Sequence, residues 1–300
     1  MRRDFTFHKN FRDDPVLREA FFRFTPPALY GADFRLWYDF GFWEDSYIPY
    51  CLMDGKNTVA NASVCEMKLL YDGKEYDAIQ LATVGTLSEY RNQGLSRILL
   101  ERIFEDYRSK TSFFFLFGNE SVVDFYPKWG FANAVESRFI LKHPARNSSP
   151  KRKRSYRVLN VHSEEDRTLF RRIANSSLPA TKRFGARDYG FILSFYWLYA
   201  FPENFFYFPD QDAILVFQRE GNVLWLHDVL CQSPFSLSDF FAEGEGRDAE
   251  EVRFGFCPDG LDVQDLAIEA VSYESDSPLF VKGFGDLGKL PFHFPILART

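Results

Sequence analysis

The sequence predicts an α+β protein with a three-layer α/β/α arrangement. Three observations predict it. Two aromatic-rich helical patterns come first, three strand patterns joined by Asp-Gly turns follow, and a strand–helix–strand unit comes next. Such a unit, joined to an antiparallel sheet, places helices on both faces of that sheet. A chain of 300 residues is long enough for two domains of this kind.

The first elements are two helices. Residues 14–24, DPVLREAFFRF, have Pro in the first turn and apolar residues spaced for one helical face. Residues 32–45, ADFRLWYDFGFWED, predict a second helix that ends near Gly41. Its aromatic residues, with one that follows, either line a substrate cleft or belong to the core: Trp37, Tyr38, Trp43 and Tyr47.

Residues 46–86 change to strand patterns. Three strands, 46–53, 58–71 and 75–86, are separated by the turns DGKN and DGK, which are typical of β-hairpins. A helix then covers about residues 94–109, with Leu95, Ile98, Leu99, Ile103 and Tyr107 on one face. The continuous apolar run at 112–118 predicts a strand buried on both faces. A short helix at 120–131, stopped by Gly130, and a further strand complete this half.

The loop before the third predicted helix has the features of an anion site. We call residues 91–96, RNQGLS, the anion loop. A helix N-terminus offers unpaired N–H groups and the positive end of the helix dipole. Gly94 allows the backbone to approach a ligand closely, because it has no Cβ. The alternative is an ordinary loop-to-helix start, since R-x-x-G is a short pattern.

Two motifs in this order resemble the GNAT superfamily of acyl-CoA-dependent N-acyltransferases. They are V-x-T-x-x-x-x-R-x-x-G-L-S at 84–96 and F-Y-x-K-x-G-F at 125–131. The resemblance covers roughly residues 5–143 and implies acetyl-CoA as cosubstrate. It implies that the anion loop holds the pyrophosphate and that pantetheine lies between the ends of strands 75–86 and 112–118. Gly85 is expected to mark a bulge that opens the sheet. The implied cofactor-binding residues are Val84, Gly85, Thr86, Arg91, Asn92, Gln93, Gly94, Leu95, Ser96 and Asn119.

Tyr126 matches the family position that protonates the departing CoA thiolate, and the resemblance implies this catalytic role. A phenol with a pKa of about 10 is a plausible donor to a thiolate of pKa about 8.5. The alternative is that Tyr126 only forms an aromatic wall of the thioester pocket. The attacking amine must also lose a proton, and the candidate bases are Glu44, Asp45, Glu66 and Glu89, each of which is otherwise a solvated charge or turn residue.

The second half repeats the element order loosely. It predicts helices at 163–175 and 189–201, a hairpin at 212–230 and a strand at 252–258. Neither acyl-CoA motif occurs there, so this half resembles a degenerate GNAT-like domain of a tandem-GNAT protein. The predicted organisation is a GNAT domain at 1–144, a basic linker at 145–157 and the degenerate domain at 158–300.

The charge of the sequence indicates which kinds of partner the protein can bind. The net charge is −6, which argues against nucleic acid. Residues 158–300 hold 22 acidic and 12 basic residues, and this charge either keeps the protein soluble or attracts a cationic amine. The run KRKR at 151–154 is either part of an exposed linker or an import or anion-binding segment.

Several expectations concern what the chain lacks. Four widely spaced cysteines predict reduced thiols in a cytoplasmic protein, and scattered histidines predict no metal. The sequence contains no apolar run that would predict a membrane span, and none near its start that would predict a secretory signal. We therefore predict an N-acetyltransferase that uses acetyl-CoA and a primary amine, small-molecule or peptide. The alternatives are a non-catalytic acyl-CoA-binding module and an aminoacyl-type transferase.

Overall fold

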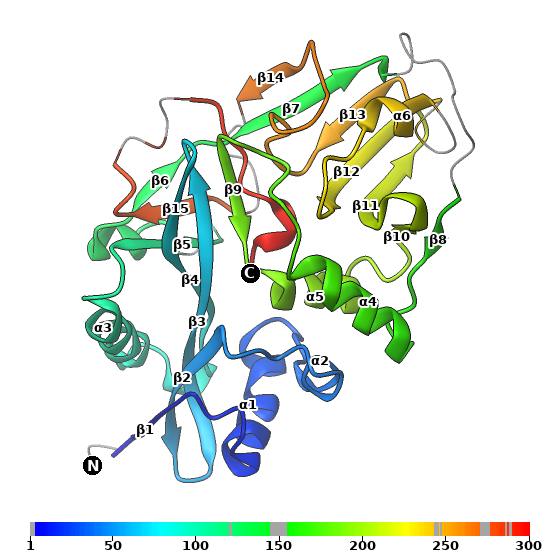
Figure 1. The fold of residues 1–300 in the computed structure, drawn as a ribbon. Helices are drawn as coiled ribbons and strands as arrows, with labels where there is room; N and C mark the ends of the chain where they lie inside the picture. The colour runs from blue at the N-terminus through cyan, green and yellow to red at the C-terminus, as the bar shows by residue number, and fades with distance from the viewer. Residues whose placement is uncertain are drawn as a thin grey trace.

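The computed structural model describes residues 4–119, 122–144, 155–242, 246, 248–270, 277–285, 287 and 290–300, and it has two lobes (Figure 1). Each lobe is built on one twisted sheet. The first sheet contains β1 (Thr6–Lys9), β2 (Tyr47–Asp54), β3 (Asn57–Tyr71), β4 (Lys74–Thr86), β5 (Phe113–Phe117), β6 (Ala132–Ala134), β9 (Phe184–Arg187) and β15 (Leu279–Lys282). The second contains β7 (Ser137–Lys142), β8 (Arg157–Val158), β10 (Phe205–Phe208), β11 (Ala213–Glu220), β12 (Val223–Leu230), β13 (Glu251–Phe254) and β14 (Ala267–Ala270).

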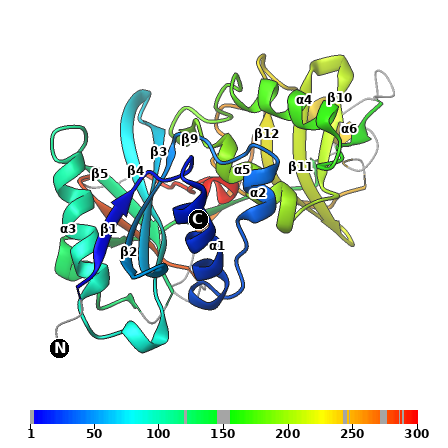
Figure 2. The same cartoon turned by 90° about the horizontal axis from the view of Figure 1, so that it is seen from below.

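Helices cover both faces of the first sheet. α1 (Pro15–Ala28) lies on the face toward the second lobe, and α3 (Leu95–Tyr107) lies on the opposite face (Figures 1 and 2). α1 begins where the sequence predicts, because the Asp14 carboxylate accepts the N–H groups of the first turn. The remaining helices are α2 (Arg35–Asp39), α4 (Glu164–Ala174), α5 (Gly190–Tyr199) and α6 (Leu237–Ala242).

The two lobes repeat one topology. In the first lobe β2, β3 and β4 form an antiparallel sheet, and β5 pairs in parallel with β4 after the crossover through α3. In the second lobe β10, β11 and β12 are antiparallel, and β13 pairs in parallel with β12 after a connection that contains α6. The repeated order agrees with the predicted fold class, a GNAT-like domain followed by a degenerate one.

The halves of the chain exchange strands. β15, from the second half, pairs with β5 and β6 in the first sheet. β7, from the first half, pairs with β13 and β14 in the second sheet. The predicted segments 1–144 and 158–300 therefore do not correspond to the two sheets. Most of the predicted basic linker, residues 145–154, lies outside the described residues.

Two apolar cores form. One lies between the first sheet and α3 and contains Leu95, Leu99, Leu100, Ile103 and Tyr126. The other joins the lobes and packs α1 and α2 against α4 and α5. At its centre the Trp37 Nε1–H donates to the Phe191 carbonyl and to Ser194 Oγ, both at 3.0 Å. Trp37, Trp43 and Tyr47 are buried and Tyr38 is half-buried, so these aromatic residues are core.

Two predicted helices are shorter than expected. The helix predicted at 32–45 is α2 alone, because Gly41 takes a φ of +72° and turns the chain toward β2. The helix predicted at 120–131 is, in its described part, a 3-10 turn at Tyr126–Trp129. Pro127 has no N–H to continue a helix, and Gly130 ends the turn with a φ of +80°. The other helices predicted from periodicity are confirmed as α1, α3, α4 and α5.

Candidate active site

Strands β4 and β5 separate at the centre of the first sheet. They pair in parallel only from Ala78 to Gln80 of β4, opposite residues 113–115 of β5, although β4 continues to Thr86. Beyond Gln80, the edge of β4 that faces β5 makes no ladder bond with it. A gap of this kind between two parallel strands is where an extended, peptide-like ligand can add to a sheet.

The β4 backbone contains a bulge at the start of this separation. Residue 61 of β3 lies opposite residue 85 of β4, while residue 63 lies opposite residue 82, so two residues of β4 face one of β3. The residue with the positive φ, +46°, is Thr83. The bulge expected at Gly85 is therefore present, and it lies immediately before this glycine, at residues 83–84. Gly85 instead allows close packing of α1, since a Cβ there would lie 3.1 Å from Leu29 Cδ2.

The anion loop follows β4 and ends at the N-terminus of α3. Gly94 is the N-cap residue, with a φ of +76°, and no side chain caps the helix. A Cβ at Gly94 would meet no described atom within 4 Å. The start of α3 therefore has no side-chain cap and has open space around Gly94, and an anion site needs both features. Arg91, Asn92 and Gln93 are exposed beside it.

Side chains fix the loop to the end of β4. The Arg91 Nε–H donates to the Thr86 carbonyl at 3.2 Å, and the Thr86 and Ser96 hydroxyls lie 3.0 Å apart. Leu95 is buried in the core beneath α3. The loop, the start of α3 and residues 84–86 of β4 thus form one connected region, and most of the residues that the resemblance implies for acetyl-CoA lie in it. Asn119 lies apart, after β5, where its carbonyl accepts the Val122 N–H at 3.1 Å.

Tyr126 lies in the core on the α3 side of the sheet. Its ring contacts Phe131 and Phe280, with centroids 5.8 and 5.7 Å away, and its side chain is 5% exposed. Burial raises the pKa of the Tyr126 phenol to about 12, so the hydroxyl stays protonated at neutral pH. Phe280 belongs to β15, so the second half of the chain supplies part of the wall around Tyr126.

The candidate bases are spread over the first lobe. Glu66 accepts the Tyr107 hydroxyl at 2.6 Å, at the end of α3 opposite the anion loop. Asp45 is exposed and pairs with Arg12 at 2.7 Å. Burial raises the pKa of Glu44, which lies near Arg171 and Asp188. Glu89 is exposed and lies in the turn after β4. The structure does not bring these carboxylates together.

The structure adds polar residues that the sequence interpretation missed. Gln80 is fully buried at the last paired position of β4, where its side-chain amide accepts the Thr300 N–H and donates to the Ala298 carbonyl. Residues 298–300 therefore lie against β4 where it leaves β5. Asn61 and Ser63 are also fully buried, on β3 beside the bulge. The available signal was a polar side chain inside an apolar strand, which requires a partner when buried.

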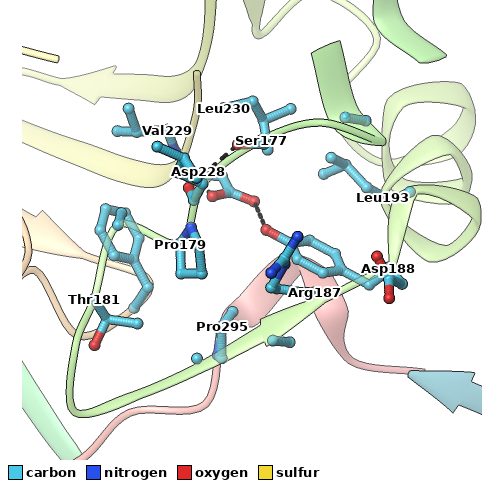
Figure 3. A pocket seen from close by; sticks show the side chains of 18 of the residues that line it. Ser177, Pro179, Thr181, Arg187, Asp188, Leu193, Asp228, Val229, Leu230 and Pro295 are labelled. Carbon is cyan, nitrogen blue, oxygen red and sulfur yellow. Dashed lines mark hydrogen bonds between the residues drawn. The ribbon is translucent and has the colours of Figure 1, made fainter. Parts of the chain in front are cut away.

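Two pockets lie away from the β4–β5 separation. One of about 260 Å³ is bounded by α1, the start of β3 and residues 87–90. The other, in the second lobe, has a cavity of about 30 Å³, enough for one or two water molecules (Figure 3). The Asp228 carboxylate faces it and accepts the Tyr189 hydroxyl at 2.7 Å. Neither pocket includes the anion loop or Tyr126.

Among the described residues, no three His, Cys, Asp or Glu side chains are grouped so that they could hold a metal ion. Over the same residues, no helix has both the length and the apolar character needed to cross a bilayer.

Comparison with known proteins places the chain. Residues 17–134 match the family model of the acetyltransferase (GNAT) domain. No curated protein matches the sequence. The fold is similar to a probable N-acyltransferase from Enterococcus faecalis V583, with a TM-score of 0.59, 9% identity, and 93% of this chain and 72% of that chain covered. It is also similar to a GCN5-related N-acetyltransferase from Anabaena variabilis ATCC 29413, with a TM-score of 0.56, 13% identity, and coverage of 92% and 72%.

A third solved structure, Eis1 from Mycobacterium abscessus, has a TM-score of 0.54 and 13% identity, with 91% of this chain and 73% of that chain covered. These identities indicate a shared fold, and the similarity extends over both lobes. The family match covers most of α1, all of α2 and α3, the bulged strand, the anion loop and Tyr126. The chain therefore carries a GNAT acetyltransferase domain at residues 17–134, and its fold is similar to that of solved GNAT structures over both lobes.

Proposed function

We propose that the protein transfers an acetyl group from acetyl-CoA to a primary amine by direct attack. The observation that carries this proposal is the separation of β4 and β5 next to a helix start capped by Gly94. The pyrophosphate would bind the N–H groups of the anion loop, and pantetheine would pair with the open edge of β4 near residues 84–86. Asn119, just beyond β5, would contact pantetheine from the other side.

The reaction needs one nucleophile and one leaving group. The amine lone pair attacks the thioester carbonyl carbon, the carbon–sulfur bond breaks, and the electron pair leaves with the CoA sulfur. Tyr126 gives its proton to that sulfur. The nitrogen gives up one proton to solvent, and the Tyr126 phenolate takes one proton back from solvent. Main-chain N–H groups at the β4 bulge stabilise the negative charge on the carbonyl oxygen.

The raised pKa of Tyr126 supports the acid role in one respect. The phenol remains protonated at every pH below about 12, so the proton donor is present throughout the physiological range. The base is not assigned to a carboxylate, since Asp45 and Glu66 have other partners at 2.7 and 2.6 Å. An amine that arrives already neutral, or one that loses its proton through water, satisfies the chemistry.

Two alternatives make different predictions. A binding module would hold acetyl-CoA without releasing thiol. An aminoacyl-type transferase would need a nucleic-acid partner, which the acidic net charge of −6 disfavours.

The test is CoA thiol release from acetyl-CoA, measured with a thiol-reactive dye across polyamines, aminoglycosides, amino acids and peptides. Amine-dependent release with a matching acetylated product supports the proposal. Binding of acetyl-CoA without release for any amine supports the binding module.

A further inference from the structure

The bulge residue of β4 has a backbone conformation that its own side chain disfavours. Thr83 has a φ of +46°, in the left-handed region. A β-branched residue there is a true outlier and persists only where its surroundings hold it. The strain lies where β4 leaves β5, so the source of the compensating contacts bears on the reaction.

Two buried side chains contact Thr83 through hydrogen bonds. Asn61 Nδ2 donates to the Thr83 carbonyl at 2.9 Å, and the Tyr47 and Thr83 hydroxyls lie 2.7 Å apart. Because a backbone carbonyl can only accept, it fixes which end of the Asn61 amide faces it. Asn61 is 0% exposed and Tyr47 is 3% exposed. Ser63 accepts an Asn61 N–H at 2.9 Å and is also hydrogen-bonded to Tyr47.

The positions of these residues are fixed by packing. The Tyr47 ring lies edge-on to Trp37 and Trp43, with centroids 5.3 and 5.4 Å away, inside the core that joins the lobes. Asn61 lies on β3 opposite Gly85, one step from the bulge. A rigid aromatic cluster and the neighbouring strand therefore hold the carbonyl and the hydroxyl of one strained residue. Such rigid support around a strained backbone is typical of a preorganised site.

We propose that Asn61 and Tyr47 are positioning residues that hold Thr83 in its left-handed conformation and so direct the main-chain N–H groups of the bulge at the thioester oxygen. The inference rests on the proposed function of the β4 edge. Neither side chain needs to touch the substrate. Their effect passes through the backbone of Thr83, so loss of either one misdirects the N–H donors while the anion loop stays intact.

The test is the carbonyl stretching frequency of acetyl-CoA labelled with ¹³C at the thioester carbon, measured by infrared difference spectroscopy with the full-length protein. Hydrogen bonds from the bulge lower this frequency on binding to the wild type. Asn61→Ala and Tyr47→Phe should reduce the shift, with acetyl-CoA affinity changed less than about twofold, because the anion loop is untouched. Tyr50→Phe, which removes the hydroxyl of another buried β2 tyrosine that donates to Asp106 instead, should retain the shift.

A fourth variant tests the strain itself. Glycine adopts a positive φ without cost, so Thr83→Gly combined with Asn61→Ala should restore part of the shift. Tyr47→Phe removes a single hydroxyl and keeps the ring, so it tests the idea even if Asn61→Ala does not fold. A wild-type frequency that does not move, or an equal shift in wild type and Tyr47→Phe, overturns the inference. Thiol release is not needed for this readout, so failure of the proposed acceptor chemistry is seen separately.

Discussion

Tyr126 and Tyr107 form a matched pair of buried tyrosines in the first lobe. The proposed mechanism uses only the Tyr126 hydroxyl, because the Tyr107 hydroxyl donates to Glu66 at the far end of α3. Tyr126→Phe should lower kcat by roughly ten- to a thousand-fold, the order of an acid–base contribution, with little change in acetyl-CoA affinity. Steady-state kinetics with the amine found in the thiol-release screen would measure this. Tyr107→Phe should keep kcat, and an unaltered kcat in Tyr126→Phe would make Tyr126 a wall residue.

The buried Asp228 carboxyl should make the stability of the fold depend on pH. Burial raises the pKa of its carboxyl to about 6, above the ordinary value near 4. A carboxyl whose folded pKa is raised contributes stability that is fully present below about pH 4 and is lost as the pH rises through about 6.

Asp228→Asn removes that titration. The free energy of unfolding of the variant, relative to wild type, should rise by about 3 kcal/mol between pH 4 and pH 8. This value follows from the raised pKa of Asp228, because each pKa unit corresponds to about 1.36 kcal/mol. Urea unfolding at the two pH values measures the change, and the pH 4 value serves as the internal control. A difference that does not vary with pH would show that Asp228 stays ionised in the fold.

Local patterns explain how much of the elements could be predicted. The Asp-Gly turns placed β2, β3 and β4, and the apolar periodicity placed α3, because these signals lie within the element itself. β1 and β15 were missed. Each has only four residues, and the partners of β15 lie far away in the sequence. Gly85 was placed correctly in the strand, but its neighbour across space is α1, which no local pattern reveals.

β15 provides a prediction at this scale. Phe280 is 2% exposed, pairs with Leu116 of β5 and packs on the Tyr126 ring. Phe280→Ala should destabilise the protein by about 3–5 kcal/mol, the cost of a large-to-small change in a core. Chemical unfolding would show it. Ile268→Ala on β14, where the side chain is 47% exposed, is the control and should cost much less. Equal effects would argue against β15 as an integral strand of the first sheet.

The whole molecule is one unit because the halves exchange strands. Removal of residues 151–300 would take β15 from the edge of β5 and leave β7 without its sheet. A protein of residues 1–150 should therefore lack a cooperative unfolding transition and should bind a dye for exposed apolar surface, whereas the full chain should not. A truncated protein that unfolds cooperatively and binds acetyl-CoA would contradict the account of strand exchange.

The acidic charge of the second half could attract a cationic amine to the active site only if it lay close to β4 and α3. The described part of segment 236–251 includes α6, which lies at the far side of the second lobe from β4 and α3 (Figures 1 and 2). This position favours a solubilising surface. Salt screens the interaction between exposed charges that lie more than about 8–10 Å apart, so distant charges act only weakly on a ligand. A cationic acceptor stays a prediction that the amine panel tests.

The anion loop allows the most direct test of the central claim, that this chain binds acyl-CoA at the start of α3. Gly94 and Gly73 both have a positive φ, +76° and +72°, and a Cβ at either would meet no described atom within 4 Å. An alanine at either position therefore carries similar backbone strain, but only Gly94 lies beside the proposed pyrophosphate site. Calorimetric titration with acetyl-CoA should show strongly weakened binding for Gly94→Ala and wild-type affinity for Gly73→Ala. Wild-type affinity in a folded Gly94→Ala variant would contradict the account.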